Sequence, residues 1–184
     1  TTEMIAFTNA HTYFRKLNTE LLGLSIDSNS SHLAWVFDIF CKTGVRVSFP
    51  IIADRNGEIA RRYGMISNDI STTEAVRNVF IIDPKGIIRT ILVYPMNVGR
   101  FIPEIIRIVQ ALQTADSNKS STAANWIPYQ PVIIPMPKTY EELEIRRNEI
   151  EKNRNGLMWY LSFKEPKMQL GENREKRGDS KVQE

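Results

Sequence analysis

The feature that most constrains this chain is a pair of apolar runs on either side of a short polar turn, within residues 74–95. Residues 79–82 and 87–94 consist largely of β-branched and aromatic side chains, which favour the strands of a sheet. Between them, the sequence Asp-Pro-Lys-Gly at 83–86 has the residue types of a type I turn in the expected order. The sequence therefore predicts two central strands joined by a tight turn.

An arginine, Arg77, opens the first of these strands. A guanidinium group beside a buried run needs an anionic partner or a route to water, because burying it unpaired is costly. The residues alone leave two interpretations of Arg77 open. One is a structural ion pair with Glu74 or Asp83, and the other is an anion bound at a functional site.

The elements before and after this hairpin predict an α/β fold with a mixed central sheet flanked by helices. Apolar residues recur at helical spacing in four segments, and two short apolar runs are typical of covered strands. The predicted helices are residues 1–17, 32–42, 58–63 and about 98–112, and the predicted strands are residues 21–26 and 49–53. In the second helix, the expected buried stripe is formed by Leu33, Val36, Phe37 and Phe40. The last helix is capped by Asn97 or starts a residue or two later, because Pro103 is best tolerated in a first turn. The first helix has no strand before it, so we expect the N-terminal strands of the fold to lie outside this chain.

A polar stretch, residues 114–122, predicts a boundary between a core and an arm. We therefore expect a core over residues 1–113, a C-terminal arm over residues 114–165 and a disordered charged tail over residues 166–184.

Within the arm, three segments differ in character. Residues 125–137 contain four prolines and are expected to be extended without regular pairing. Thr139 and Glu142 have the spacing of a capping box that opens a helix to about residue 152. Residues 157–163 form a hydrophobic and aromatic patch, which predicts packing against a partner subunit.

Charge and composition disfavour several classes of function. The net charge of +3 is carried by scattered basic residues, so no nucleic-acid footprint is indicated. No apolar run approaches the roughly 18 residues that a membrane span needs. Cys41 has no second cysteine to pair with, which favours a reducing, cytoplasmic compartment, and we expect it to be a small buried hydrophobe. His11 and His32 lack a third ligand nearby, so we predict no metal site and place both at a helix surface or cap.

Six motifs taken together resemble the peroxiredoxins, and within that family the one-cysteine type with a long C-terminal arm, especially its archaeal members. They are TTE at the start of a helix, GLSIDSNSSHLAW, FPIIAD, GEIARRYG, VRNVFIIDPKGIIR and YPMNVGR. The arm segment NWIPYQPVIIPMP fits the same subgroup. The resemblance covers residues 1–165 and implies a thioredoxin-like fold and a cofactor-free, thiol-dependent peroxidase. It also implies a peroxide substrate, an external thiol reductant and a homodimer of the kind that often assembles into decameric rings.

The resemblance also assigns the site. In this family the peroxidatic cysteine stands directly before Thr-Thr-Glu, so we expect it immediately before Thr1, outside the chain. Arg77 matches the active-site arginine, and Arg100 matches a second positive group beside it. A helix N-terminus and nearby cations lower a thiol pKa, which keeps the nucleophile ionised. The implied reaction is attack on the O–O bond to give a cysteine sulfenic acid, which an external thiol then reduces.

Alternatives remain for each assignment. Glu3 either pairs with one of the arginines or is simply a favourable acid in a first helical turn. Arg100 either faces an anion or covers apolar surface with its stem. Trp35 and Tyr94 match family positions but are expected to pack. The rival function is a non-catalytic oligomeric holdase, and a generic ligand-binding domain is disfavoured because no Gly-rich phosphate loop is present.

Overall fold

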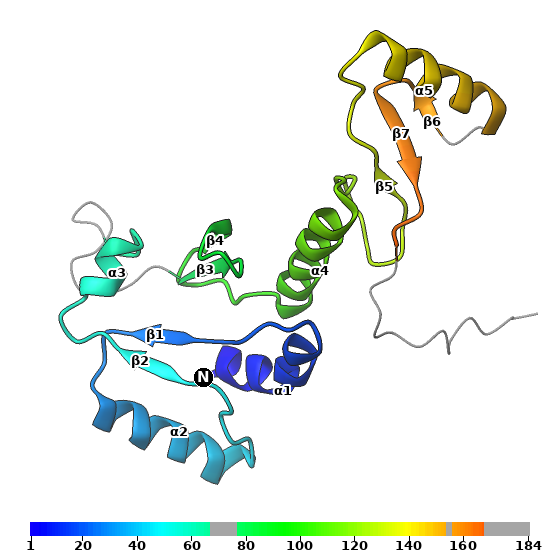
Figure 1. Ribbon diagram of the computed structural model, residues 1–184. Coiled ribbons are helices and arrows are strands. Elements are labelled where there is room, and N and C mark those ends of the chain that lie inside the picture. Colours follow the sequence, from blue (N-terminus) through cyan, green and yellow to red (C-terminus); the bar gives the residue numbers. More distant parts are fainter. Residues whose placement is uncertain (67–76, 154–155, 168–184) are drawn as a thin grey trace, which may run out of the picture. The chain divides into compact units, whose positions relative to one another are not determined.

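The structure is a computed structural model that describes residues 1–66, 77–153 and 156–167. It divides into two compact units, Thr1–Val109 and Gln110–Glu184. The elements of the first unit, which Figure 1 labels, are α1 (Thr2–Lys16), β1 (Gly23–Ser25), α2 (Asn29–Thr43), β2 (Ile51–Ala53), α3 (Glu58–Arg62), β3 (Arg77–Ile82), β4 (Ile88–Tyr94) and the start of α4 (Ile102–Asn118). Those of the second unit are the end of α4, β5 (Val132–Ile133), α5 (Tyr140–Asn153), β6 (Gly156–Met158) and β7 (Leu161–Lys164).

The first unit contains one parallel and one antiparallel pair of strands. β1 and β2 run parallel with Gly23 opposite Ile51, and α2 lies alongside β2 (Figure 1). β3 and β4 form the predicted hairpin, in which the amide of Gly86 donates to the carbonyl of Asp83 at 2.9 Å. Strands with helices between them confirm the predicted α/β class, although among the described residues the parallel and antiparallel pairs form two separate small sheets rather than one mixed sheet.

The core of the first unit joins α1, α4 and the hairpin. Its buried residues are Phe14, Ile102, Ile105 and Val109, with exposures of 1–7%. Val79 and Leu92, one from each strand of the hairpin, pack against them. Full burial of such side chains stabilises the fold by about 1.5–3 kcal/mol each. This core therefore joins the first helix of the unit, α1, to its last helix, α4, and to the hairpin.

Helix α2 buries a different face from the one predicted. Ser28 caps it by accepting the amide of Ser31 at 3.2 Å, and Gly44 ends it in the left-handed region at φ 71°. The predicted stripe is exposed, with Leu33 at 69% and Phe37 at 66%. His32 and Ile39, two turns apart, are the residues that α2 buries.

Three predictions about this helix are therefore wrong. The apolar stripe of α2 is not its buried face. Cys41 is exposed rather than a buried hydrophobe, because it follows the exposed Phe40 on the side away from Ile39. His32 is 6% exposed rather than a surface or cap residue.

Helix α4 begins later and ends later than predicted. Residues 95–98 form a turn, with the amide of Val98 donating to the carbonyl of Pro95 at 3.1 Å, so Asn97 does not cap the helix. Pro103 is then the second helical residue, within the first turn where proline is tolerated. The helix also continues through residues 114–118, which we expected to be a flexible boundary. Polar side chains are accommodated in this last turn of the helix. The side-chain amide of Asn118, for example, donates to the backbone carbonyl of Thr114 at 3.0 Å.

The second unit is a three-stranded sheet, in the order β5-β7-β6, with α5. β5 pairs with β7, so the expectation that residues 125–137 have no regular pairing is wrong for Val132 and Ile133. The capping of α5 is as predicted, because the amide of Glu142 donates to the Thr139 hydroxyl at 3.2 Å. Trp126, at 1% exposure, is among the most buried side chains of this unit.

Among the described helices, none combines the length and the apolar character that a membrane crossing requires. The expected tail lies mostly in residues 168–184, outside the described part of the chain.

Candidate active site

Glu3, Arg77 and Arg100 come together around one carboxylate. Arg100 Nη1 lies 2.6 Å from Glu3 Oε2, and the backbone amide of Arg100 donates to Glu3 Oε1 at 2.8 Å. Arg77 Nη1 lies 3.5 Å from the same Oε1. Of the two interpretations of Glu3, the geometry therefore matches the one in which it pairs with an arginine, and it pairs with both.

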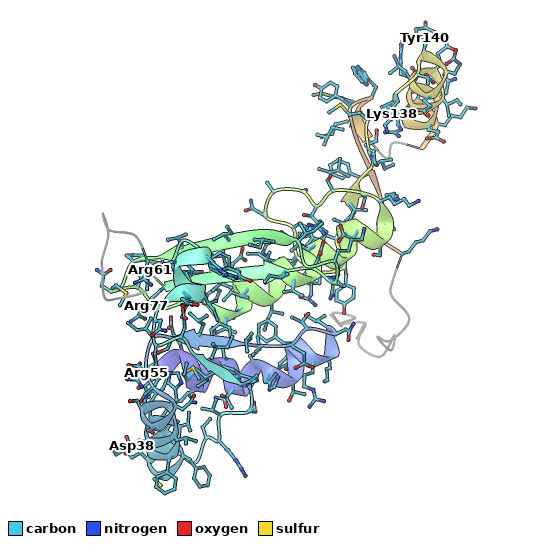
Figure 2. The ribbon with its side chains drawn as sticks, turned by 60° about the vertical axis from the view of Figure 1, so that its left-hand side comes forward. Asp38, Arg55, Arg61, Arg77, Lys138 and Tyr140 are labelled. Atoms are coloured by element: carbon cyan, nitrogen blue, oxygen red, sulfur yellow. The ribbon has the colours of Figure 1, made fainter. Side chains whose placement is uncertain are left out.

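Three separate elements position these side chains. Glu3 is in the first turn of α1, and Arg77 is the first residue of β3, opposite Tyr94 in β4. Arg100 precedes α4 by two residues rather than lying in its first turn as expected. Its guanidinium group is also tied to β3, because Nη2 donates to the carbonyl of Asn78 at 3.2 Å. Figure 2 labels Arg77 on the ribbon of the first unit.

Of the two alternative ion pairs of Arg77, the one with Asp83 is not formed. Asp83 accepts the amides of Lys85 and Ile87 and lies 3.5 Å from Arg89 at the other end of the hairpin. Glu74 lies outside the described residues. Arg77 is thus oriented by Glu3, a residue of a different element.

The described part of the site is partly shielded from water and contains two guanidinium groups and one carboxylate. The side chains of Glu3 and Arg100 are 18% and 17% exposed, whereas that of Arg77 is 33% exposed. Burial lowers the pKa of Arg100, the carboxylate of Glu3 acts in the opposite direction, and the charge of Arg77 lowers it further. Two guanidinium groups share one carboxylate, so the cluster favours an additional anion.

The N-terminus of α1 lies beside this cluster. The carbonyl of Thr1 accepts the amide of Ile5 at 3.2 Å, as in a helical turn. The hydroxyl of Thr1 accepts the indole N–H of Trp35 at 3.2 Å. The amides at the N-terminal end of a helix attract negative charge. They therefore add to the positive potential of the two arginines.

Sequence reasoning missed the polar contact of Trp35, for which only packing was expected. Tyr94 is half-buried in β4, where it lies opposite Arg77. His11 is also a polar anchor, because Nδ1 lies 2.7 Å from Ser48 Oγ and Nε2 lies 3.8 Å from Glu20. Among the described residues, no group of three or more His, Cys, Asp or Glu side chains could hold a metal ion.

Comparison with known proteins yields two matching family models. The AhpC/TSA family matches residues 1–91, and the C-terminal domain of 1-Cys peroxiredoxin matches residues 111–149. Among curated relatives, Peroxiredoxin 2 of Caldanaerobacter subterraneus subsp. tengcongensis is 54% identical over 164 residues, covering 89% of this chain and 74% of the relative. Peroxiredoxin of Aquifex aeolicus is 45% identical over 174 residues, covering 89% of this chain and 77% of the relative.

Solved structures agree with these matches. The yeast mitochondrial 1-Cys peroxiredoxin is 35% identical with a TM-score of 0.74, covering 89% of this chain and 78% of that one. A Cys-to-Ser mutant of peroxiredoxin 6 of Arenicola marina is 28% identical with a TM-score of 0.75, covering 91% of this chain and 80% of that one.

The fold and these matches define a thiol-dependent peroxidase built on a thioredoxin-like fold. The chain belongs to the AhpC/TSA family of peroxiredoxins, enzymes that reduce peroxides with electrons from thiols.

Proposed function

We propose that the residue directly before Thr1 in the full protein is the peroxidatic cysteine, and that Arg77 and Arg100 stabilise its thiolate and the bound peroxide. The observation that carries this proposal is the shared carboxylate of Glu3, which holds both guanidinium groups at the N-terminus of α1. A thiol at that point meets a helix N-terminus and two cations, and each of these lowers a thiol pKa.

The proposed reaction uses that thiolate as the nucleophile. Its sulfur attacks one oxygen of the peroxide, an S–O bond forms and the O–O bond breaks. The leaving hydroxide or alkoxide takes up a proton, and the cysteine becomes a sulfenic acid. An external thiol then attacks the sulfenic sulfur, releasing water and forming a mixed disulfide, and a second thiol restores the thiolate.

The two arginines have different parts in this proposal. Arg100 is the more buried and is fixed by Glu3 and by the carbonyl of Asn78. It supplies a fixed positive charge. Arg77 is twice as exposed and has a longer contact with Glu3, so it is the guanidinium group that can turn toward the thiolate or the peroxide.

Substitution of Arg77 in the full-length protein tests the assignment. Arg77→Ala is expected to slow peroxide reduction and to raise the pKa of the cysteine, measured by the pH dependence of its alkylation. Arg89→Ala is the matched control, because Arg89 belongs to the same hairpin and has an ion pair of the same 3.5 Å length. Equal reactivity of wild type and Arg77→Ala would refute the role of Arg77, and turnover that survives replacement of the cysteine by serine would refute the proposed nucleophile.

We also propose that the second unit is an oligomerisation arm, in line with the domain division expected from the sequence. Support comes from the turn between β6 and β7, where neighbouring large side chains are exposed. Leu157 is 77%, Trp159 43% and Tyr160 45% exposed. Replacing Trp159 and Tyr160 together by serine should shift the protein to smaller species in sedimentation velocity, and an unchanged distribution would exclude this surface.

The holdase alternative is not favoured by any contact in the structure. Holding unfolded chains needs exposed apolar surface but gives no reason for two guanidinium groups around Glu3. A cysteine-to-serine variant separates the two functions, because it should abolish peroxide reduction and leave suppression of client aggregation unchanged.

A further inference from the structure

A serine and a histidine of the first unit are in hydrogen-bond contact outside the cluster of Glu3, Arg77 and Arg100. Ser48 precedes β2 by three residues, and His11 is in the third turn of α1. Ser48 Oγ lies 2.7 Å from His11 Nδ1, at the short end of the range for such a bond. The two residues are 37 positions apart in the chain, so the tertiary structure brings them together.

Aromatic packing around Phe49 fixes the place of both side chains. Phe49 is 9% exposed, and its ring meets those of His11 and Phe7 edge-on, with centroid distances of 6.0 and 6.5 Å, respectively. Phe7 and His11 are four residues apart, so they lie on one face of α1. Ser48 directly precedes the buried Phe49 but is itself exposed. Its hydroxyl group is therefore held against the imidazole ring and is still accessible from solvent.

Glu20 lies on the other side of this imidazole ring. Its Oε2 is 3.8 Å from Nε2 of His11, and the histidine side chain is 12% exposed. Nε2 is buried and has no hydrogen-bond partner among the described residues. A carboxylate at this distance favours the proton on Nε2, which leaves Nδ1 to accept the hydroxyl proton of Ser48. A hydroxyl group, a base and an acid that orients the base are the parts that activate a serine for nucleophilic attack.

We propose that Ser48 is an activated nucleophile that accepts acyl groups, with His11 as its general base and Glu20 as a positioning residue. The Ser48 oxygen attacks the carbonyl carbon of the acyl donor, while Nδ1 of His11 takes up the hydroxyl proton. The bond to the leaving group then breaks, the leaving group takes up that proton, and an acyl ester of Ser48 remains. The donors that fit are acyl groups on a good leaving group, such as aryl esters, thioesters or acyl phosphates, because a single base gives the leaving group little further help.

Acetylation of the full-length protein by p-nitrophenyl acetate tests the inference, with the modified residues identified by peptide mass spectrometry. Ser31 is the matched control within the same chain. It is also an exposed serine, but its hydroxyl lies 2.9 Å from that of Ser28 rather than from an imidazole. A positioned general base accelerates a reaction by about 10²–10⁴-fold, so Ser48 should be acetylated at least about 100-fold faster than Ser31. Equal rates at the two serines would overturn the inference, as would an acetyl group found on His11 and not on Ser48.

His11→Gln separates base catalysis from simple accessibility of Ser48. Glutamine keeps a hydrogen-bonding group beside the hydroxyl but is not a base, so acetylation of Ser48 should fall by about 100-fold or more. An unchanged rate at Ser48 would contradict the assignment of His11. Glu20→Gln should slow the reaction by at most about fivefold, because the Glu20 side chain is 82% exposed and its ion pair is screened by water. A loss as large as that in His11→Gln would assign the activation to Glu20 instead.

Ser48→Ala separates this inference from the proposed peroxidase. The variant should lose the acetyl group at residue 48 and retain full peroxide reduction, because the Ser48 hydroxyl contacts His11 and not the cluster of Glu3, Arg77 and Arg100. Acetylation of the protein that continues at the wild-type rate in Ser48→Ala would show that Ser48 is not its main site and would overturn the inference. Thermal unfolding of each variant shows whether it is folded.

Discussion

Replacing Glu3 by glutamine should destabilise the protein far more than the same change at another glutamate–arginine pair. Glutamine has nearly the shape of glutamate, but it lacks the charge and has only one side-chain oxygen. In Glu3→Gln, Arg100 therefore loses one of its two short bonds, at 2.6 and 2.8 Å, and both guanidinium groups lose their counter-charge.

The expected cost follows from the burial of the pair. A hydrogen bond to a charged group contributes about 1.5–3 kcal/mol, and removing one partner of a fully buried pair costs about 3–5 kcal/mol. The side chains of Glu3 and Arg100 are 18% and 17% exposed, so water still screens part of this energy. We expect the free energy of unfolding to fall by about 2–3 kcal/mol. For a chain of this length that corresponds to a fall in Tm of about 4–12 °C.

Glu104→Gln is the control, because Glu104 has bonds of the same length in a more exposed place. Arg107 Nε and Nη2 lie 2.6 and 2.8 Å from its two oxygens, but these side chains are 32% and 37% exposed. A surface pair contributes about 0.2–1 kcal/mol. Thermal and denaturant unfolding of the two variants should differ accordingly. Equal losses of stability would show that burial does not set the strength of the Glu3 cluster.

The remaining predictions concern positions outside this cluster. Phe14→Ala should lower the free energy of unfolding by about 3–5 kcal/mol in denaturant titration, since the side chain is 1% exposed in the core, and a loss below 1 kcal/mol would contradict that packing. Gly44→Ala should cost about 1 kcal/mol in the same assay through backbone strain at φ 71° alone, because an added Cβ meets nothing within 4 Å. Cys41 should be alkylated without denaturant at a rate near that of a free thiol, as mass spectrometry can show, and protection would place it under a covering surface. The amides of Ile87 and Lys85, together with Arg89, lower the pKa of Asp83. The ionised Asp83 therefore stabilises the fold above about pH 4, and this stabilisation is lost as pH falls through the lowered pKa. Asp83→Asn should flatten the acid side of the profile of stability against pH, and an unchanged profile would contradict a stabilising role of Asp83.

Local sequence was sufficient to predict the hairpin turn and the cap of α5. The Asp-Pro-Lys-Gly turn pairs Ile82 with Ile88, whereas Arg77 lies opposite Tyr94 because of a register shift between Ile81 and Ile82, which the turn does not predict. Thr139 caps α5 through a residue three positions away. The turn and the cap each depend on neighbours in the chain, so residue types and spacing determine them.

The buried face of α2 could not be predicted in the same way. Apolar residues occupy most of its circumference, including Leu33, Phe37 and Ile39, and a helix that is apolar nearly all round has no unique stripe. Helix α2 contacts β2 and buries His32 and Ile39, so its buried face is determined by the tertiary structure rather than by the local sequence. In α4, by contrast, the local signal was present, because Pro103 favours a start later than residue 98 and the helix begins at Ile102.

The candidate site was predicted as a set of residues but not as a geometry. Resemblance to a family named Arg77 and Arg100, and Glu3 was left with two alternatives, whereas the sharing of its carboxylate by both arginines became visible only in the structure. The bond from Trp35 to Thr1 links residues 34 positions apart, and no periodicity relates them.

The separation of Glu3 and Arg100 by 97 residues has a consequence for synthesis of the protein. Closing so long a loop carries a large entropic cost, so contacts of this kind form after local helices and hairpins. On the ribosome, α1 emerges long before Arg100 is translated, at about 5–20 residues per second. For several seconds the nascent helix has its acid without the distant arginine that completes the cluster. A nucleophile at its N-terminus would acquire its full positive surroundings only when the first unit has closed, so the protein would become reactive toward peroxide as its folding is completed.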